Sequence, residues 1–206
     1  MSKKKYLLHL WFFSALILFL GAGSIHAQSS SFKDNIYPVG KLKPCDSVLK
    51  VNVGDSAPDF TLPAVEGGKI TLSQYRGKKN VVISFVPAAW TPVCSDQWPG
   101  YNIAQDLFVK NDAILLGITV DNIPTLYSWT KQMCNQGEKL WFTVLSDFYP
   151  HGEVASKYGI LRSNGVSERA LFVIDKKGII RYIDVHDINQ RPPLDELAAA
   201  IVKLNH

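Results

Sequence analysis

A short apolar run and the proline-containing turn after it constrain the fold of this chain more than any other feature. Residues 81–86 read VVISFV, which is typical of a strand buried on both faces of a sheet. Pro87 closes the run, and Thr91 followed by Pro92 is the pattern of a helix N-cap with proline at the first helical position. The sequence therefore predicts a buried strand, a turn, and a helix that carries Cys94 in its first turn.

The position of Cys94 has a chemical consequence. Backbone N–H groups at the start of a helix lack partners within the helix and, together with the helix dipole, stabilise anions. Helix N-termini therefore favour the thiolate, which is the nucleophilic form of cysteine. The carboxyl ends of strands are also where open α/β sheets place their ligands. A single cysteine is usually a small buried hydrophobe, but this context supports the hypothesis that Cys94 is an activated nucleophile.

The same residues reproduce a family motif. Pro87, Thr91 and Cys94 match the Pro-x-x-x-Thr/Ser-x-x-Cys motif of the peroxiredoxins, the thiol peroxidases related to alkyl hydroperoxide reductase C and thiol-specific antioxidant protein. Within that family the chain is most similar to the bacterioferritin-comigratory and AhpE-like subgroups. The resemblance covers about residues 51–204 and includes the segments 53–60 (VGDSAPDF) and 72–78 (LSQYRGK).

The resemblance implies an activity and a set of site residues. The activity is reduction of hydrogen peroxide or organic hydroperoxides through a Cys94 thiolate and a sulfenic acid intermediate. The family pattern places an arginine at the start of a later central strand, where this chain has Arg169, and a guanidinium can donate to both thiolate and oxygen. Thr91 can donate and accept, so it can bridge peroxide and thiolate besides capping the helix. Pro87 would shape the loop over the sulfur.

The sulfenic acid must be reduced again through a disulfide with a second thiol, the resolving thiol. The sequence does not determine which thiol this is. Some relatives carry a second cysteine five residues after the first, but this chain has Pro99 there. Others carry one on the helix after the next strand, where Cys134 is the preferred candidate. Cys45 or an external thiol is the alternative. Bridging to Cys94 requires Cα atoms within about 7 Å, so the helix around Cys94 would have to unwind locally.

The first 27 residues have the pattern of a secretory signal peptide. Lys3, Lys4 and Lys5 form a positively charged start, residues 6–20 are almost wholly apolar, and small residues lead to Ala27. We expect cleavage after Ala27 and export to a bacterial periplasm or cell envelope. An uncleaved membrane anchor is the alternative, although the apolar run is short beside the roughly 20 residues of a spanning helix. Membrane contact is expected only through such a segment.

Composition sets the expected domain organisation. With 206 residues, of which 47% are hydrophobic, the chain can bury one core. We expect a signal peptide at 1–27, a leader or linker at 28–50 whose prolines and glycine discourage regular structure, and one domain at 51–206. Without its first 27 residues the chain has 19 basic against 18 acidic side chains. This balance, without a basic cluster interleaved with aromatics, indicates no nucleic-acid partner.

The order of predicted elements indicates the fold class. Gly67 and Gly68, between two short apolar segments, predict an N-terminal β-hairpin. Strands and helices then alternate before an antiparallel strand pair and a last helix, which predicts an α/β thioredoxin-like sandwich with a central mixed sheet and helices on both faces. Pro99 and Gly100 predict a kink early in the helix after Cys94. The expected strands are 81–86, 113–120, 142–145, 169–174 and 179–185, and the expected helices start at 92, 124, 150 and 194.

No cofactor or metal is indicated, because the five histidines are scattered without ligand spacing. The partners that the resemblance implies are the peroxide and a thioredoxin-like or small-molecule thiol reductant, and a homodimer is compatible with it. Most tryptophans are expected to be packing residues. Trp90 lies inside the turn before Cys94 and is a candidate for the wall of the peroxide pocket.

Two other functions fit the same fold. An exported thiol-disulfide oxidoreductase needs a Cys-x-x-Cys motif, whereas the residues from Cys94 read CSDQ. Such enzymes also resemble one another in a cis-proline before a central strand, and this chain has no proline between Pro150 and Pro192. A non-catalytic binding module is the second alternative. The intact set of Pro87, Thr91, Cys94 and Arg169 argues against it.

Overall fold

The structure is a computed structural model that describes residues 31–134 and 139–205. The expected signal peptide, residues 1–27, lies outside this part of the chain. Within it, every helix is too short or too polar to span a bilayer.

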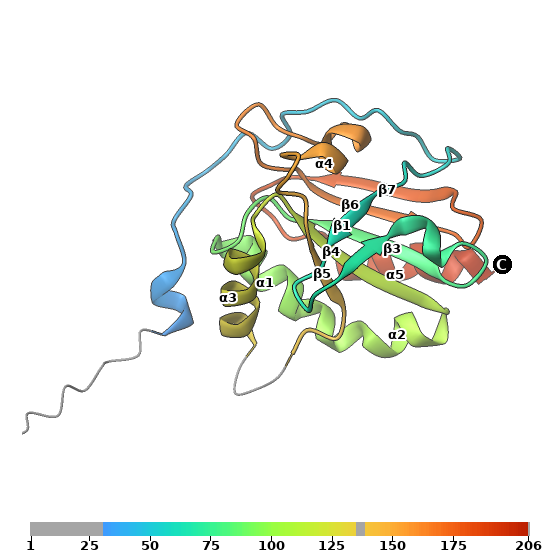
Figure 1. The fold of residues 1–206 in the computed structure, drawn as a ribbon, viewed down its shortest axis with the longest axis horizontal. Coiled ribbons are helices and arrows are strands. Elements are labelled where there is room, and N and C mark those ends of the chain that lie inside the picture. The colour runs from blue at the N-terminus through green and yellow to red at the C-terminus, as the bar shows by residue number, and fades with distance from the viewer. Residues whose placement is uncertain (1–30, 135–138, 206) are drawn as a thin grey trace, which may run out of the picture.

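A five-stranded mixed sheet forms the centre of the molecule (Figure 1). The middle strand β3 is buried along its whole length, because it carries apolar side chains toward both faces. It pairs in parallel with β4 and antiparallel with β6. The fold is thus the expected α/β thioredoxin-like sandwich. In spatial order the strands are β5 (Thr143–Ser146), β4 (Ala113–Thr119), β3 (Asn80–Phe85), β6 (Arg169–Ile174) and β7 (Ile180–His186).

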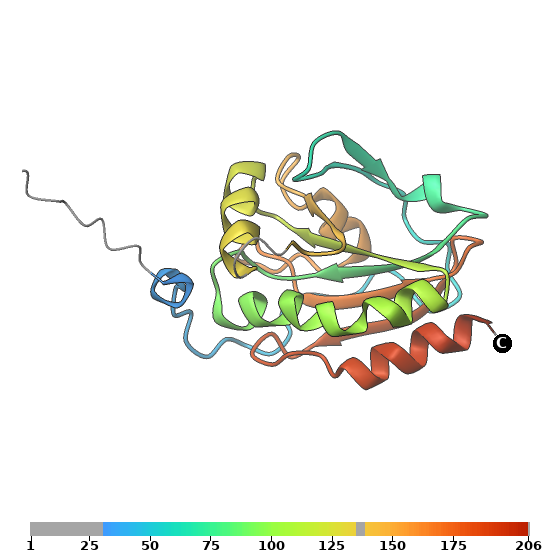
Figure 2. The ribbon, with the colours of Figure 1, turned by 90° about the horizontal axis from the view of Figure 1, so that it is seen from below.

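Two hydrophobic clusters, one on each face of the sheet, form the core. Helices α1, α2, α3 and α5 contribute to one cluster, in which Trp98 of α1 packs on Trp129 of α3 with ring centroids 5.0 Å apart. Helix α4 and the N-terminal β1/β2 hairpin cover the other face (Figure 2). The elements are β1 (Thr61–Pro63), β2 (Lys69–Thr71), α1 (Pro92–Gly100), α2 (Gln105–Lys110), α3 (Ile123–Met133), α4 (Glu153–Tyr158) and α5 (Leu194–Val202).

The helix after β3 is interrupted where the sequence predicts a kink. Pro99 lies inside α1 and has no N–H to bond the carbonyl one turn before it. Helix α1 ends at Gly100, a 3₁₀ turn spans Tyr101–Ala104, and α2 resumes at Gln105. The interruption lets Tyr101 turn its side chain into the core, where it is 3% exposed.

The expected leader segment is part of the domain surface. Apart from a 3₁₀ turn at Phe32–Asn35, its described residues have no regular structure, as its prolines and glycine predict. We call residues 37–50 the N-terminal strap; it crosses the domain in light blue in Figure 1. Its backbone donates from Tyr37 to the Trp90 carbonyl at 2.7 Å and from Lys50 to the Tyr158 carbonyl at 3.2 Å. It also passes so close to Gly159 that a Cβ there would collide with strap backbone.

We predict that Gly117→Ala in β4 destabilises the fold. A Cβ at this position would lie 2.8 Å from Trp98 Cζ2 and 3.1 Å from Phe142 Cε2, and Trp98 is fully buried. Overpacking of this kind costs about 1–3 kcal/mol. Urea denaturation followed by circular dichroism measures the loss of free energy of unfolding.

The control for this prediction is the same substitution in a Trp98→Leu background. The smaller side chain makes room for the new methyl group, so Gly117→Ala should cost less there. An equal cost in both backgrounds would show that the contact with Trp98 is not responsible.

Candidate active site

The turn after β3 has the backbone geometry that the sequence predicts. Helix α1 begins at Pro92, and Thr91 occupies the N-cap position with extended backbone, φ −108° and ψ 153°. Cys94 is therefore the third residue of the helix. Its own N–H is among those that have no acceptor within the helix. The sulfur lies at the positive end of the helix dipole.

Arg169 meets Cys94 because of the pairing between β3 and β6. These strands run antiparallel with Phe85 opposite Ala170, so the start of β6 lies beside the turn that leaves β3. Arg169 Nη2 lies 3.5 Å from Cys94 Sγ. Both residues are buried, with 1% of Arg169 and none of Cys94 exposed. A thiolate and a guanidinium at this distance stabilise each other's charge strongly, since little water intervenes.

The remaining donors of Arg169 hold it in place. Nε and Nη2 donate to the Ile188 carbonyl at 3.3 and 3.1 Å, and Nη1 donates to Gln97 Oε1. In residues 31–134 and 139–205, no carboxylate forms an ion pair with this guanidinium. A buried charge is strongly destabilising unless an opposite charge lies beside it. Cys94, as thiolate, is the group placed to supply that charge.

Gln97 is a site residue that the sequence analysis missed. It lies three residues after Cys94 and hence on the same face of α1. Its amide accepts from Arg169 and donates to Tyr101 Oη at 2.8 Å and to Ser84 Oγ at 3.2 Å. Burial raises the pKa of Tyr101, so its phenol stays protonated. The signal in the sequence that could have identified Gln97 was a polar residue three positions after the cysteine, on a helix face that is otherwise buried.

Thr91 does not cap the helix through its side chain, so that expectation is wrong. Its hydroxyl donates instead to the Ala88 carbonyl, with an O–O distance of 2.9 Å. The turn places this carbonyl within hydrogen-bonding distance of the hydroxyl. Because its only hydrogen is engaged with the Ala88 carbonyl, Thr91 does not donate to Cys94 in this conformation. Its lone pairs remain able to accept from a peroxide O–H.

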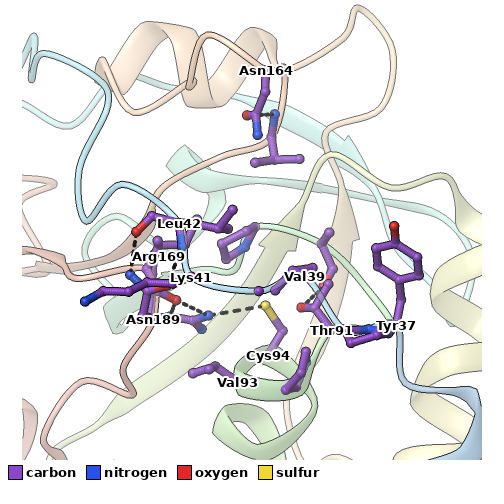
Figure 3. A pocket seen from close by; sticks show the side chains of 17 residues that line it. Tyr37, Val39, Lys41, Leu42, Thr91, Val93, Cys94, Asn164, Arg169 and Asn189 are labelled. Carbon is purple, nitrogen blue, oxygen red and sulfur yellow. Dashed lines mark hydrogen bonds between the residues drawn. The ribbon is translucent and has the colours of Figure 1, made fainter.

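The site residues open into one cavity of about 610 Å³ (Figure 3). Pro87, Thr91, Cys94 and Arg169 all line it, and residues 37–42 of the strap form one wall. Trp90 is not part of this lining, contrary to expectation. Its backbone is in the left-handed region with φ 61°, and its ring packs on Phe32 with centroids 5.9 Å apart.

The two candidate resolving cysteines lie outside the cavity lining. Cys45 is an exposed strap residue whose Sγ lies 3.7 Å from the Val185 carbonyl oxygen. Cys134 follows the last residue of α3 and is 7% exposed within a core cluster. Neither forms a disulfide with Cys94 in this conformation. Three other arginines pair with acids, unlike Arg169: Arg162 with Glu168, Arg181 with Asp175 and Arg191 with Asp96.

Among the described residues, no group of three His, Cys, Asp or Glu side chains is arranged to hold a metal ion.

This geometry defines a class: a thioredoxin-like fold with a cysteine in the first turn of a helix beside a buried cation. The model of the AhpC/TSA family matches residues 53–183. The chain belongs to the AhpC/TSA family of peroxiredoxins, and it is a thiol-dependent oxidoreductase with peroxide as acceptor.

Individual relatives agree with this assignment. Alkyl hydroperoxide reductase E of Mycobacterium bovis is 37% identical over 154 residues, covering 72% of this chain and 97% of the relative. A putative peroxiredoxin in a rubredoxin operon of Clostridium pasteurianum is 36% identical over 152 residues, covering 70% and 84%. The reduced 2-Cys peroxiredoxin of Plasmodium vivax superposes with a TM-score of 0.70 at 30% identity, covering 76% and 83%. The expected similarity to the AhpE-like subgroup is thus confirmed.

We predict that Arg169→Met slows oxidation of Cys94 by hydrogen peroxide about 100-fold, because loss of one buried donor to a developing charge typically costs this much. Gln97→Met should slow it less, by roughly tenfold, because the guanidinium stays but loses an orienting acceptor. The measurement is the second-order rate constant of thiol loss in a stopped-flow instrument.

Arg191→Met is the matched control. Arg191 Nη1 pairs with Asp96 at 2.9 Å on the surface, with half of its side chain exposed. Its loss should change the rate by less than about twofold. A loss as large as that of Arg169→Met would mean that general positive charge, and not the buried contact, accelerates the reaction.

Proposed function

We propose that Cys94 is the residue that attacks peroxide and that Arg169, Thr91 and Pro87 form its immediate surroundings. The observation that carries this proposal is the buried guanidinium of Arg169, which has Cys94 Sγ at 3.5 Å and no carboxylate partner among the described residues. A neutral thiol would leave that cation uncompensated. The arrangement is explained if the sulfur is held as an anion.

In the first step, the Cys94 thiolate attacks the terminal oxygen of R–O–O–H. The O–O bond breaks as the S–O bond forms, giving Cys94–S–OH and an alkoxide R–O⁻, which takes a proton to leave as R–OH. The sulfur is oxidised by two electrons and the peroxide is reduced by two. Arg169 donates to the oxygen that gains charge, and Thr91 accepts from the peroxide O–H to orient it. Pro87 forms part of the wall that excludes water.

In the second step, a thiol R′–SH attacks the sulfenic acid, giving a mixed disulfide and water, and a second thiol releases Cys94 as R′–S–S–R′ forms. We propose that both thiols are external and come from a thioredoxin-like protein or a small molecule. Cys134 sits at the end of α3 inside the core, and Cys45 faces carbonyls of β7. Desolvation and the Glu168 carboxylate also raise the pKa of the Cys45 thiol, which makes it a poor nucleophile at neutral pH.

The alternative functions have less support. An oxidoreductase of the thioredoxin type would need a second cysteine three residues after Cys94, where this chain has Gln97 bound to Arg169. A non-catalytic module would have no need of a buried cation at the cysteine. Both alternatives predict no stoichiometric reaction with peroxide.

Export and self-association complete the proposal. The signal-like residues 1–27 support export to a bacterial periplasm or cell envelope, and N-terminal sequencing of the mature protein tests cleavage after Ala27.

Phe148 and Tyr149 are 48% and 87% exposed on one loop. A second copy of the chain would shield them, so we propose a homodimer, which analytical ultracentrifugation tests.

We predict that the reduced protein loses one thiol equivalent per hydrogen peroxide and that Cys94→Ser abolishes this loss. Serine keeps the size of the side chain but is not oxidised by peroxide. Stopped-flow mixing with thiol quantification gives the stoichiometry and the rate. A rate no faster than that of free cysteine would contradict the proposed role of Cys94.

We predict that Cys45→Ser and Cys134→Ser leave peroxide turnover with an external dithiol within about twofold of the parent. In the absence of added thiol, the sulfenic acid should persist and be trapped by dimedone on Cys94. Mass spectrometry after a few seconds of oxidation is the measurement. An abundant Cys94–Cys134 or Cys94–Cys45 disulfide at that time would show that the chain resolves itself.

A further inference from the structure

The wall of the cavity that faces Cys94 comes from outside the family domain. The family match begins at residue 53, whereas residues 37–42 of the strap line the cavity. Figure 3 shows Val39 of the strap close to Thr91 and Cys94, and Leu42 near Arg169. A segment that belongs to this chain, and not to the matched domain, therefore shapes the space in which peroxide must bind.

Hydrogen bonds hold this wall against the catalytic loop. Asn189 accepts from the Leu42 N–H and donates to the Leu42 carbonyl, both at 2.8 Å. The Ile188 N–H donates to the Pro44 carbonyl at 3.1 Å, and the Ile188 carbonyl accepts from Arg169. The strap is thus fastened to the residue that also orients the guanidinium.

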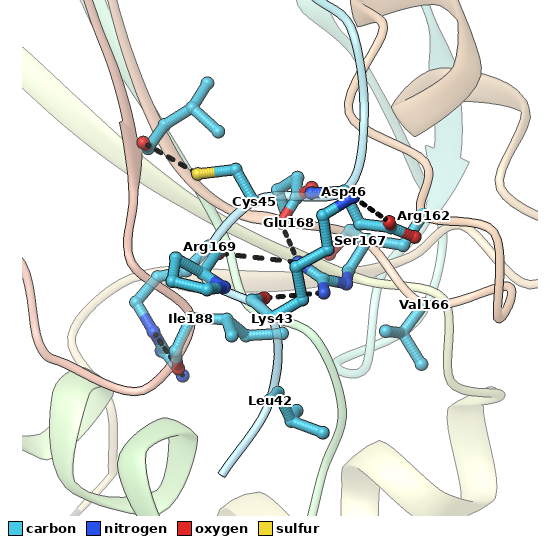
Figure 4. A network of polar contacts seen from close by, with 12 residues as sticks. Leu42, Lys43, Cys45, Asp46, Arg162, Val166, Ser167, Glu168, Arg169 and Ile188 are labelled. Carbon is cyan, nitrogen blue, oxygen red and sulfur yellow. Dashed lines mark hydrogen bonds and ion pairs between the residues drawn. The ribbon is translucent and has the colours of Figure 1, made fainter.

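A buried ion pair fastens the strap a few residues further on (Figure 4). Arg162 and Glu168 pair with 4% and none of their side chains exposed. Arg162 Nη2 donates to the Lys43 carbonyl at 2.8 Å, and Glu168 accepts from the Asp46 N–H at 2.6 Å. Both buried charges therefore form hydrogen bonds with the strap backbone. The strap is thus held at both ends of the segment 42–46, which directly follows the wall residues 37–42.

The cavity is much larger than hydrogen peroxide requires. A water molecule occupies about 30 Å³, and hydrogen peroxide has only two heavy atoms, whereas the cavity holds about 610 Å³. Cavities of several hundred cubic ångströms accommodate organic ligands of ten or more heavy atoms. The strap and the facing loops line it with apolar side chains: Pro38, Val39, Leu42, Val93, Val166 and Ile188.

We propose that strap residues 37–42 are a specificity-determining wall, and that the cavity they close over Cys94 selects hydroperoxides with an apolar alkyl or aryl substituent. This inference rests on the proposed function of Cys94. The O–O group reaches the sulfur and the guanidinium, while the carbon substituent packs between the strap and Val93. An apolar pocket distinguishes substrates by the apolar surface that they bury in it.

The experiment compares cumene hydroperoxide with hydrogen peroxide. The readout is the ratio of their second-order rate constants for oxidation of Cys94, measured by stopped flow on the full mature chain. In the parent protein this ratio should exceed that of free cysteine at least about tenfold. Val39→Trp fills the cavity from the strap side and should lower the ratio at least about tenfold.

Two further variants make the result specific. Val48→Trp adds the same bulk at a strap residue that is 84% exposed and outside the cavity lining, so it should leave the ratio within about twofold. Asn189→Ala removes both hydrogen bonds to Leu42 and should also lower the ratio, even if Val39→Trp fails to fold. A parent-like ratio in Val39→Trp would overturn the proposal that the strap determines specificity. If that variant does not fold, a parent-like ratio in Asn189→Ala would do so. An equally large fall of the ratio in Val48→Trp would also overturn it. Failure of parental Cys94 to react with either peroxide would overturn the proposed function and this inference together.

Discussion

The buried contact between Arg169 and Cys94 determines how the rest of the site is built. Taking a guanidinium out of water costs several kcal/mol unless an anion and hydrogen-bond acceptors replace the solvent. Here the acceptors are the Ile188 carbonyl and the Gln97 amide oxygen, and the Cys94 sulfur lies 3.5 Å from the guanidinium. In the proposed function this sulfur is the anion that compensates the buried cation, so burying the arginine favours the reactive form of the cysteine.

The fold brings these groups together through two independent features. The antiparallel register of β3 and β6 sets Arg169 beside the turn that follows Phe85. The proline at the start of α1 then places Cys94 and Gln97 one helical turn apart, on the same face. Ser84, at the end of β3, accepts from both Gln97 and Trp98 and so ties the helix to the strand.

Much of this arrangement was predictable from sequence, and the exceptions have physical reasons. The strand, the turn and the helix start near Cys94 depend on local signals, and the fold class follows from the alternation of elements. The Thr91 hydroxyl was not predictable, because a rotatable group bonds whichever acceptor the turn brings nearest. Gln97 and the strap were missed because their partners lie far away in the chain: Gln97 binds Arg169, and the strap binds backbone groups near residues 90, 158 and 188.

Ile188 forms hydrogen bonds with both the strap and the guanidinium. Its N–H binds Pro44 and its carbonyl binds Arg169. The backbone of a single residue thus couples the position of the strap at Pro44 to the acceptor that aligns the guanidinium, so a shift of the strap at this point alters the setting of the cation beside Cys94.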